Sequence, residues 1–384
     1  MKLATEVITD LARASELTRE WEALAVAASK PVAGASWVLG WWRHVAPEQT
    51  VARVIVVRDG ERLVGMAPFY LASQRRGVAE YRLMASDFGA CMEPLALPGR
   101  ERELGEAIAI ALSSTAPRAD VIGFGPMPIA SPWVDAVRES IPGRLGALVR
   151  RTRMEGAPIV ELREPDFESW FQTLGSKLRR DLRRSERSFE EAGGTVRWTD
   201  ASTLRDDAQS FARLHAGRWE SRGWSRLADL GERLPDWVVE VVSPLIDEGR
   251  AGLCVLELDG EPICIDLHFS AGEEVVGVNV GWDQAHAKLG PAKLVLLRVI
   301  ERAYANGAAR VNLGNGTLSN KVRIANSDDP AAWTSVLAPR PRLPLAYAAI
   351  APVLARRHTR ALLARTLPER WFERLKDLVK RTRS

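Results

Sequence analysis

The same hairpin pattern occurs twice in this chain. Residues 58–69 read RDGERLVGMAPF, and two hundred positions later residues 258–269 read LDGEPICIDLHF. Both stretches contain Asp-Gly, a dipeptide that accepts the left-handed backbone of a tight turn, between an apolar run and an alternating apolar run. Each stretch therefore predicts a β-hairpin, and a gapless alignment places Phe69 over Phe269. This repetition favours a chain built from two related units.

The elements around the hairpin repeat in a similar order. In the first half, two helices precede the hairpin, the first with Ser15 as its candidate cap, and a strand, a helix and a strand follow it. These elements are expected over 15–28, 35–45, 91–97, 101–115 and 119–127. In the second half, a basic helix ends at Gly193-Gly194, and the elements after it are expected over 195–199, 206–223, 273–283, 292–307 and 309–314.

The fold class follows from this order. A chain of 384 residues is longer than most single domains, so two domains are expected. We predict an α+β (mixed α/β) protein of two tandem units, 1–155 and 156–340, each with a mainly antiparallel sheet flanked by helices. A basic helical tail, 341–384, would follow.

Composition narrows the cellular setting. The three cysteines, Cys91, Cys254 and Cys264, show no metal-site spacing, so we expect reduced thiols and no metal. The first ten residues lack the apolar core of a secretion signal, and the apolar run 345–354 is too short to span a bilayer. We expect a cytoplasmic protein, with the inner face of the membrane as a peripheral location.

The second hairpin carries the candidate acid–base groups. In the strand CIDLHF, Asp266 and His268 are two residues apart and therefore face the same side of a sheet. The corresponding strand of the first half, LVGMAPF, has no ionisable side chain. Asp283, at the end of the next strand, is a further candidate. The alternatives are a polar, solvent-facing side of the sheet for the pair and a role in turn formation for Asp283.

A phosphate site is predicted where the strand 273–283 leads through Gly290-Pro291 into a helix. The first turn of a helix offers free backbone N–H groups, and Lys288 and Lys293 flank this turn. An ordinary strand-to-helix turn without a ligand is the alternative.

Several motifs together resemble the Gcn5-related N-acyltransferase (GNAT) superfamily, in its tandem-domain branch. That branch includes the Fem-like transferases and the CelD/BcsL group linked to exopolysaccharide synthesis. The motifs, in chain order, are ASWVLGWW, LGSKLRRDLRRSERSFEEAGG, LHAGRWESRG, LGPAKLVLL and GNGTLSNKVRI. The resemblance implies a GNAT fold, direct acyl transfer and acetyl-CoA or another acyl-CoA as donor, held by Lys288, Gly290, Ala292 and Lys293. Ala287 stands where the superfamily has Gln or Arg, and Fem-like members use aminoacyl-tRNA instead.

Candidate substrate-binding residues lie around that donor loop. Arginine forks suit phosphate groups, and a Lys in the Gly-rich closing motif matches the family. The candidates are Arg180, Arg184, His215, Arg218, Trp219, Asn320, Lys321 and Arg323. The alternatives are a solvated helix for the arginines, a packed His for His215 and a solvated strand end for the last three.

These observations lead to three hypotheses. The first is an N-acyltransferase that modifies an amino sugar of a glycan precursor, an acceptor implied only by the resemblance. The second is a Fem-like transferase that uses aminoacyl-tRNA. The third is a non-catalytic binder of an anionic ligand, such as cyclic di-GMP through RRHTR, or of an anionic membrane. In the tail, Leu367, Trp371, Leu375 and Leu378 would form an apolar stripe beside Arg370, Arg374 and Lys380.

Overall fold

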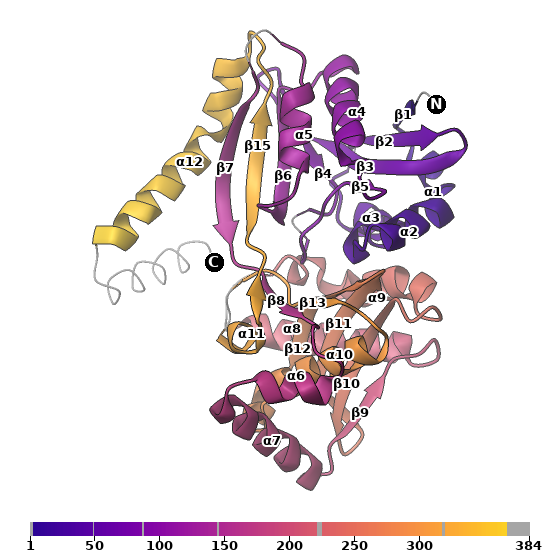
Figure 1. Cartoon of the computed structure of the whole chain (residues 1–384), viewed down its shortest axis with the longest axis vertical. Helices are drawn as coiled ribbons and strands as arrows, with labels where there is room; N and C mark the ends of the chain where they lie inside the picture. Colours follow the sequence, from indigo (N-terminus) through magenta and orange to yellow (C-terminus); the bar gives the residue numbers. More distant parts are fainter. Residues whose placement is uncertain are drawn as a thin grey trace.

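The computed structural model describes residues 3–48, 50–86, 88–143, 146–220, 225–316 and 319–366. It contains two mainly antiparallel sheets flanked by helices, which lie one above the other in Figure 1. The predicted α+β class is therefore confirmed. No helix of the described residues is long and apolar enough to cross a membrane.

The first sheet has the strand order β1-β2-β3-β4-β6-β15-β7, with β5 paired to β3. Its strands are β1 (Ala4–Ile8), β2 (Val51–Asp59), β3 (Arg62–Arg75), β4 (Val78–Leu83), β5 (Leu95–Ala96), β6 (Val121–Pro128), β7 (Leu148–Glu155) and β15 (Ala331–Leu337). Its helices are α1 (Leu11–Ser15), α2 (Thr18–Ala27), the 3-10 turn η1 (Pro31–Ala33), α3 (Ala35–His44), α4 (Glu101–Ser114) and α5 (Trp133–Ser140).

The second sheet has the order β14-β8-β13-β12-β11-β10-β9. Its strands are β8 (Pro158–Glu161), β9 (Thr195–Trp198), β10 (Ala251–Leu258), β11 (Glu261–Ala271), β12 (Glu274–Trp282), β13 (Arg310–Asn312) and β14 (Ser327–Asp328). The helical elements are α6 (Phe167–Thr173), α7 (Ser176–Glu191), α8 (Leu204–Glu220), η2 (Ala228–Arg233), α9 (Leu234–Val242), η3 (Ser243–Leu245), η4 (Gln284–Leu289), α10 (Pro291–Ala305) and α11 (Ser319–Ile324). The last described helix, α12 (Leu343–Thr366), follows β15 of the first sheet.

The two hairpins and their surroundings repeat in three dimensions. β2 and β3 pair antiparallel, β4 follows, and α4 leads to β6, which is parallel to β4. The second sheet repeats this with β10, β11, β12, α10 and β13. The turns differ by one residue from the gapless alignment, because Asp59 pairs with Arg62 whereas Leu258 pairs with Glu261.

The two sheets exchange strands, which sequence reasoning missed. β7 lies in the first sheet and the chain continues into β8 of the second, whereas β14 lies in the second and the chain continues into β15 of the first. β15 lies between β6 and β7, as Figure 1 shows. The expected second unit, 156–340, therefore contains a strand of the first sheet, and no single cut separates the two sheets.

The two halves also share one apolar core. Trp37 of α3 makes edge contacts with Trp237 of α9 and with Phe269 of β11, at ring-centroid distances of 5.1 and 5.2 Å. Phe88 contacts the same Trp237 at 5.1 Å. At Gly40, an added Cβ would lie 2.3 Å from a methyl carbon of Val241, so α3 and α9 approach closely at this position. The relative placement of the sheets thus depends on buried aromatic contacts between them.

The helix cap predicted at Ser15 is absent from the structure. Ser15 does not cap the helix after it: it ends α1, its hydroxyl donates to the Leu11 carbonyl, and α2 begins at Thr18 without a side-chain cap. The hydroxyl is thus engaged one turn back in its own helix.

The tail residues expected to form an amphipathic stripe lie outside the described residues. They are Leu367, Arg370, Trp371, Arg374, Leu375, Leu378 and Lys380.

Candidate active site

A cavity of about 190 Å³ opens beside β12 of the second sheet. β12 and α10 contribute half of the lining residues, Asp266 of β11 and Lys321 of α11 contribute charged groups, and Gly89 comes from the first half. Arg218 of α8 also lines it. The remaining lining residues are Gly277, Val278, Asn279, Val280, Ala292, Leu296, Val299, Val311, Leu313 and Asn315.

The cavity exists because β12 and β13 pair over only a short distance. β13 pairs with β12 through Glu274, Val275 and Val276, and ends at Asn312, while β12 continues to Trp282. The β11–β12 register also shifts between Leu267 and His268, which indicates a bulge in β12. Beyond Val276, β12 therefore presents backbone groups toward the cavity side without a strand partner among the described residues.

Asp266 is the most perturbed group in the cavity. Its side chain is buried, the whole residue being only 4% exposed, and its Oδ1 atom has no hydrogen-bond partner. Burial raises the pKa of this carboxyl to about 8, although the positive charges of Lys321 and Arg218 oppose the shift. A carboxyl with a pKa near neutrality is suited to accept a proton from an ammonium group.

Lys321 complements this carboxyl. Burial, together with the charge of Arg218, lowers the pKa of its ammonium group to about 8, and the negative charge of Asp266 works against this. An added Cβ on Gly314 would lie 3.5 Å from the Lys321 Nζ atom and 2.9 Å from the Gly277 carbonyl oxygen. Gly314 has a φ of 75°, so both space and backbone conformation call for glycine there. The Gly-rich turn leads into α11, not into the solvated strand end that was the alternative.

α8 positions Arg218 at the cavity. The Arg218 Nη1 atom donates to the Val280 carbonyl of β12. His215, one turn earlier, is fully buried, with its Nε2 atom 3.2 Å from the Ser225 hydroxyl. Burial, and secondarily Arg218, lowers the pKa of His215 to about 4. A Cβ on Gly281 would lie 2.7 Å from the His215 backbone nitrogen, so α8 packs directly on β12 and His215 supports this contact without lining the cavity.

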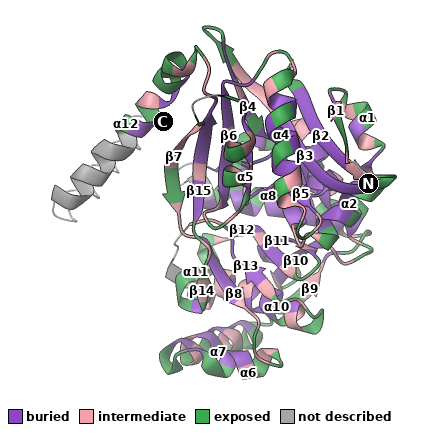
Figure 2. Cartoon of the chain, turned by 45° about the horizontal axis from the view of Figure 1, so that its top comes forward, coloured by how far each residue is buried: buried purple, intermediate pink, exposed green. Residues whose placement is uncertain are grey.

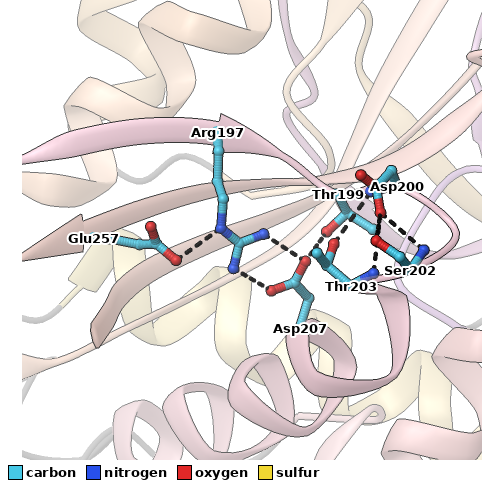
Figure 3. A network of polar contacts seen from close by, with 7 residues as sticks. All are labelled: Arg197, Thr199, Asp200, Ser202, Thr203, Asp207 and Glu257. Carbon is cyan, nitrogen blue, oxygen red and sulfur yellow. Dashed lines mark hydrogen bonds and ion pairs between the residues drawn. The ribbon is translucent and has the colours of Figure 1, made fainter. Parts of the chain in front are cut away.

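A buried polar network holds the other end of α8 (Figure 3). Arg197 of β9 contacts both carboxylate oxygens of Asp207, at 2.6 and 2.8 Å, and donates to Glu257 of β10 at 2.7 Å. The Thr199 hydroxyl also donates to Asp207. Burial tends to raise the pKa of Asp207, but the hydrogen bonds from Arg197 and Thr199 outweigh it and the pKa is lowered. The network therefore fixes α8 to the sheet edge.

His268 lies next to Asp266 but not on the cavity wall. Its Nδ1 atom is 3.9 Å from the Asp266 Oδ1 atom, and its ring packs edge-on against Trp198 at 5.2 Å. Both residues are buried, which excludes the solvent-facing alternative. Burial, and then Arg302, lowers the pKa of His268 to about 3, so the imidazole is neutral and weakly basic near pH 7.

Asp283 lies in a turn at the end of β12. Its carboxylate accepts a 2.9 Å hydrogen bond from the Ala285 backbone N–H and caps η4. Asp283 does not line the cavity. This position matches the alternative of a turn-forming residue.

The predicted donor loop adjoins the cavity. Gly290 has a φ of 67° and precedes Pro291, the first residue of α10, and Ala292 in the first turn lines the cavity. Lys288 is exposed, while the Lys293 Nζ atom donates to the Ser185 hydroxyl of α7 at 3.2 Å. A ligand with phosphates at this loop could therefore reach into the cavity with its other end.

The basic helix α7 presents charge to solvent, and Figure 2 shows its outer side as exposed. Arg180 and Arg184 are exposed and form no hydrogen bond or ion pair with the described residues. Arg323 of α11 lies 3.5 Å from Asp181 of α7, in an exposed ion pair. The side chains of Trp219 and Asn320 lie outside the described residues.

Sequence reasoning did not select three polar or small residues at the cavity. Asn279 and Asn315 line it, and Asn315 accepts a 3.0 Å hydrogen bond from the Cys91 thiol of the first half. Asn315 belongs to the quoted GNG motif, which could have identified it. Gly89 has no such signal, because it comes from the other half of the chain.

A family model of known proteins matches the part of the chain that forms most of this cavity. Residues 176–321 match the family model described as an acetyltransferase (GNAT) domain. The similarity to a GNAT domain therefore covers residues 176–321, which are less than half of the chain. The matched segment runs from α7 to Lys321 and so contains the predicted donor loop, Asp266 and all residues that line the cavity except Gly89.

Solved structures resemble almost the whole chain in fold. FemX covers 90% of this chain over 99% of its own length, with a TM-score of 0.58 and 11% identity. The C-terminal domain of a putative lysylphosphatidylglycerol synthetase from Agrobacterium fabrum covers 88% of this chain over 96% of its own, with a TM-score of 0.58 and 12% identity. L-PGS from Bacillus licheniformis covers 88% over 96% of its own length, with a TM-score of 0.55 and 13% identity. At such identities the likeness concerns the fold. No curated protein matches significantly by sequence.

Proposed function

We propose that the chain is an N-acyltransferase whose second sheet carries the reaction by direct transfer. The observation that carries this proposal is Asp266. It is a buried carboxyl with a raised pKa and an unpartnered oxygen, at a cavity that also contains Lys321 and adjoins the Gly290 loop. A donor can lie with its phosphates at the loop and its acyl group beside β12, and the acceptor amine then meets Asp266.

The proposed reaction begins with the acceptor in its ammonium form. The Asp266 carboxylate takes one proton from the ammonium, and the free amine attacks the acyl carbonyl carbon. The protonated Lys321 faces the oxyanion of the tetrahedral intermediate and stabilises it. When the intermediate collapses, the bond to the donor breaks, and the leaving thiolate of an acyl-CoA takes the second proton from the new amide nitrogen. His268 has a pKa too low for the base and acts as a neighbour that positions Asp266.

Acetyl-CoA or another acyl-CoA is the proposed donor. Lys288, Lys293 and the first turn of α10 would hold the pyrophosphate, which is the usual use of a helix N-terminus with flanking cations. The proposed acceptor is an amino sugar on a lipid- or nucleotide-linked glycan precursor, as the resemblance to the exopolysaccharide-linked group implies. The exposed Arg180 and Arg184 could then bind phosphates of the precursor.

Calorimetric titration with acyl-CoAs tests the donor site. The wild type should bind a donor saturably, and Gly290→Asp should weaken binding at least about tenfold, because a carboxylate beside a pyrophosphate is repelled. Gly307→Asp is the matched control: Gly307 has a similar φ, 70° against 67°, and lies at the other end of α10. If both variants bind as the wild type does, the phosphates are not at this loop. If the folded wild type binds no acyl-CoA, the acyl-CoA donor is excluded.

A second donor class has its own support. The FemX and lysylphosphatidylglycerol synthetase folds resemble the whole chain, and α7 presents unpaired arginines to solvent. An aminoacyl-tRNA donor would bind with an affinity that falls steeply as salt rises, and Arg180→Ala/Arg184→Ala would reduce the slope of that dependence. Flat salt dependence, or an unchanged slope in the double variant, would exclude binding of tRNA through α7.

A further inference from the structure

The outer face of α12 is apolar along its first thirteen residues. Ala346, Ile350 and Leu354 pack on the first sheet, against residues that include Val121 and Leu337. In the same stretch, Leu345, Tyr347 and Val353 are 49%, 39% and 47% exposed. From Leu343 to Ala355 the helix has no charged residue. An outward helix face in a water-soluble region normally carries charges, so this face is unusual.

Arginines surround this face at its beginning. A pocket of about 370 Å³ lies where the chain enters α12, and Arg118, Arg340 and Arg342 line it. We call it the arginine pocket. Arg340 donates to the Ser113 carbonyl at 2.8 Å and Arg342 to the Gly77 carbonyl at 2.6 Å. A guanidinium carries five N–H donors, so these single bonds hold the groups in place and leave donors available.

The charge around the arginine pocket is strongly positive. Arg75 and Arg76, in the turn between β3 and β4, are exposed at the same end of the sheet. The pocket contains one acid, Asp120, which is buried and accepts a hydrogen bond from the Ala79 N–H at 2.9 Å. Residues 330–368 contain no Asp or Glu and six arginines, four of them in the second half of α12. Beside the helix, the Arg150 guanidinium lies 5.4 Å from the Tyr347 ring centroid.

We infer that this end of the first sheet docks on an anionic membrane surface. The apolar face of α12 enters the headgroup–acyl boundary, and the arginine pocket binds lipid phosphate. An apolar helix face bordered by arginines and a tyrosine has the chemistry of an interfacial helix, and the absence of Asp and Glu from residues 330–368 matches a negatively charged surface.

Vesicle flotation of the full chain tests the apolar face. We expect binding to vesicles of phosphatidylcholine mixed with phosphatidylglycerol, and much weaker binding to phosphatidylcholine alone. Val353→Glu should reduce binding to the mixed vesicles by roughly tenfold or more. Ile110→Glu is the matched control, because Ile110 is 50% exposed on α4. Equal binding of the two variants, or none by the wild type, overturns the inference.

The arginine pocket is tested in the same assay. Arg118→Ala should lower binding to the mixed vesicles by about fivefold and leave binding to phosphatidylcholine unchanged. Arg62→Ala is the control, since Arg62 is exposed at the other end of β3. Sedimentation velocity identifies the competing occupant: if wild type is a dimer that Val353→Glu dissociates, and neither binds vesicles, the face is an interface between copies and the inference is wrong.

Discussion

The strands β3 and β11 occupy equivalent places in two related sheets, yet only one carries ionisable side chains. Between Leu63 and Phe69, β3 is entirely uncharged and its residues are buried. β11 is buried to the same degree, but it includes Asp266 and His268. Both strands follow an Asp-Gly turn and pair with a third antiparallel strand. Burying a carboxyl costs free energy, and β3 has no buried carboxyl. The buried carboxyl of Asp266 in β11 is therefore not explained by a contribution to stability.

The neighbouring strands show what the difference provides. In the second sheet, β12 runs on past the end of β13, and Asp266 borders the cavity that opens there. In the first sheet, β15 pairs along the whole of β6, from Val121 to Pro128, and α12 packs against the end of these strands. One copy thus provides a reactive cavity, and the other provides a scaffold and, in our inference, a docking surface.

Of the substitutions that test the difference between β3 and β11, Asp266→Asn should have the largest effect on the rate of transfer. Loss of the proposed base should reduce transfer by roughly 10³-fold. The melting temperature should not fall, because the substitution removes a carboxyl group whose ionised form is disfavoured by burial, as its raised pKa indicates. Met66→Leu in β3 is the control and should leave the rate unchanged. Steady-state rates and thermal unfolding of both variants check this. Full activity of Asp266→Asn would exclude the base.

Trp37→Ala tests whether the two halves are energetically separate. Trp37 contacts Trp237 and Phe269 of the second half, so its truncation should lower the free energy of unfolding by roughly 4 kcal/mol. We expect the two halves still to unfold in one transition, measured by tryptophan fluorescence and circular dichroism in denaturant. Two separate transitions in wild type would contradict a shared core.

Lys321→Met should reduce kcat/KM by roughly 10²-fold, since one cation facing the oxyanion is lost. The pH profile sharpens this expectation. Asp266 works as the carboxylate, above its pKa of about 8, and Lys321 as the ammonium, below its pKa of about 8, so the coupled pair should give a bell-shaped profile near pH 8. Lys321→Met should lose the alkaline limb. A profile without that limb in wild type would exclude the role of Lys321.

His268→Gln should have the smallest effect. Its pKa of about 3 leaves it neutral over the working range, and it acts through Asp266, so the rate should fall by less than the roughly 100-fold expected for Lys321→Met. The acidic limb of the pH profile should shift while the limb from Lys321 stays. A loss as large as that of Asp266→Asn would make His268 the base.

The sequence was informative where local pattern decides structure. Turn dipeptides and alternation predicted the paired hairpins, and the spacing of Asp266 and His268 placed them on one side of β11. The strand exchange was not predictable in this way, because β8 and β14 are short and the partners of the exchanged strands lie far apart in the chain. The roles of His268 and His215 also depended on burial, since sequence cannot show that Trp198 and α8 exclude them from the cavity.

The residues that line the cavity were also only partly predictable from the sequence. Ala292 and Lys321 of its wall were identified from motifs, but Gly89 and Asn279 belong to it only through tertiary contacts. The exposed face of α12 is a further case: its composition was visible as an apolar run, but only the structure shows which residues pack inward and which face outward.

The most direct test of the central claim is thiol release from acetyl-CoA in the presence of glucosamine, followed across pH for wild type and Asp266→Asn. We predict a rate in wild type that rises as the pH approaches 8, and a rate in the variant near the uncatalysed background at every pH, while calorimetry shows that both bind the donor equally. Equal rates for both proteins, at equal donor binding, would show that the second sheet does not carry the reaction through Asp266.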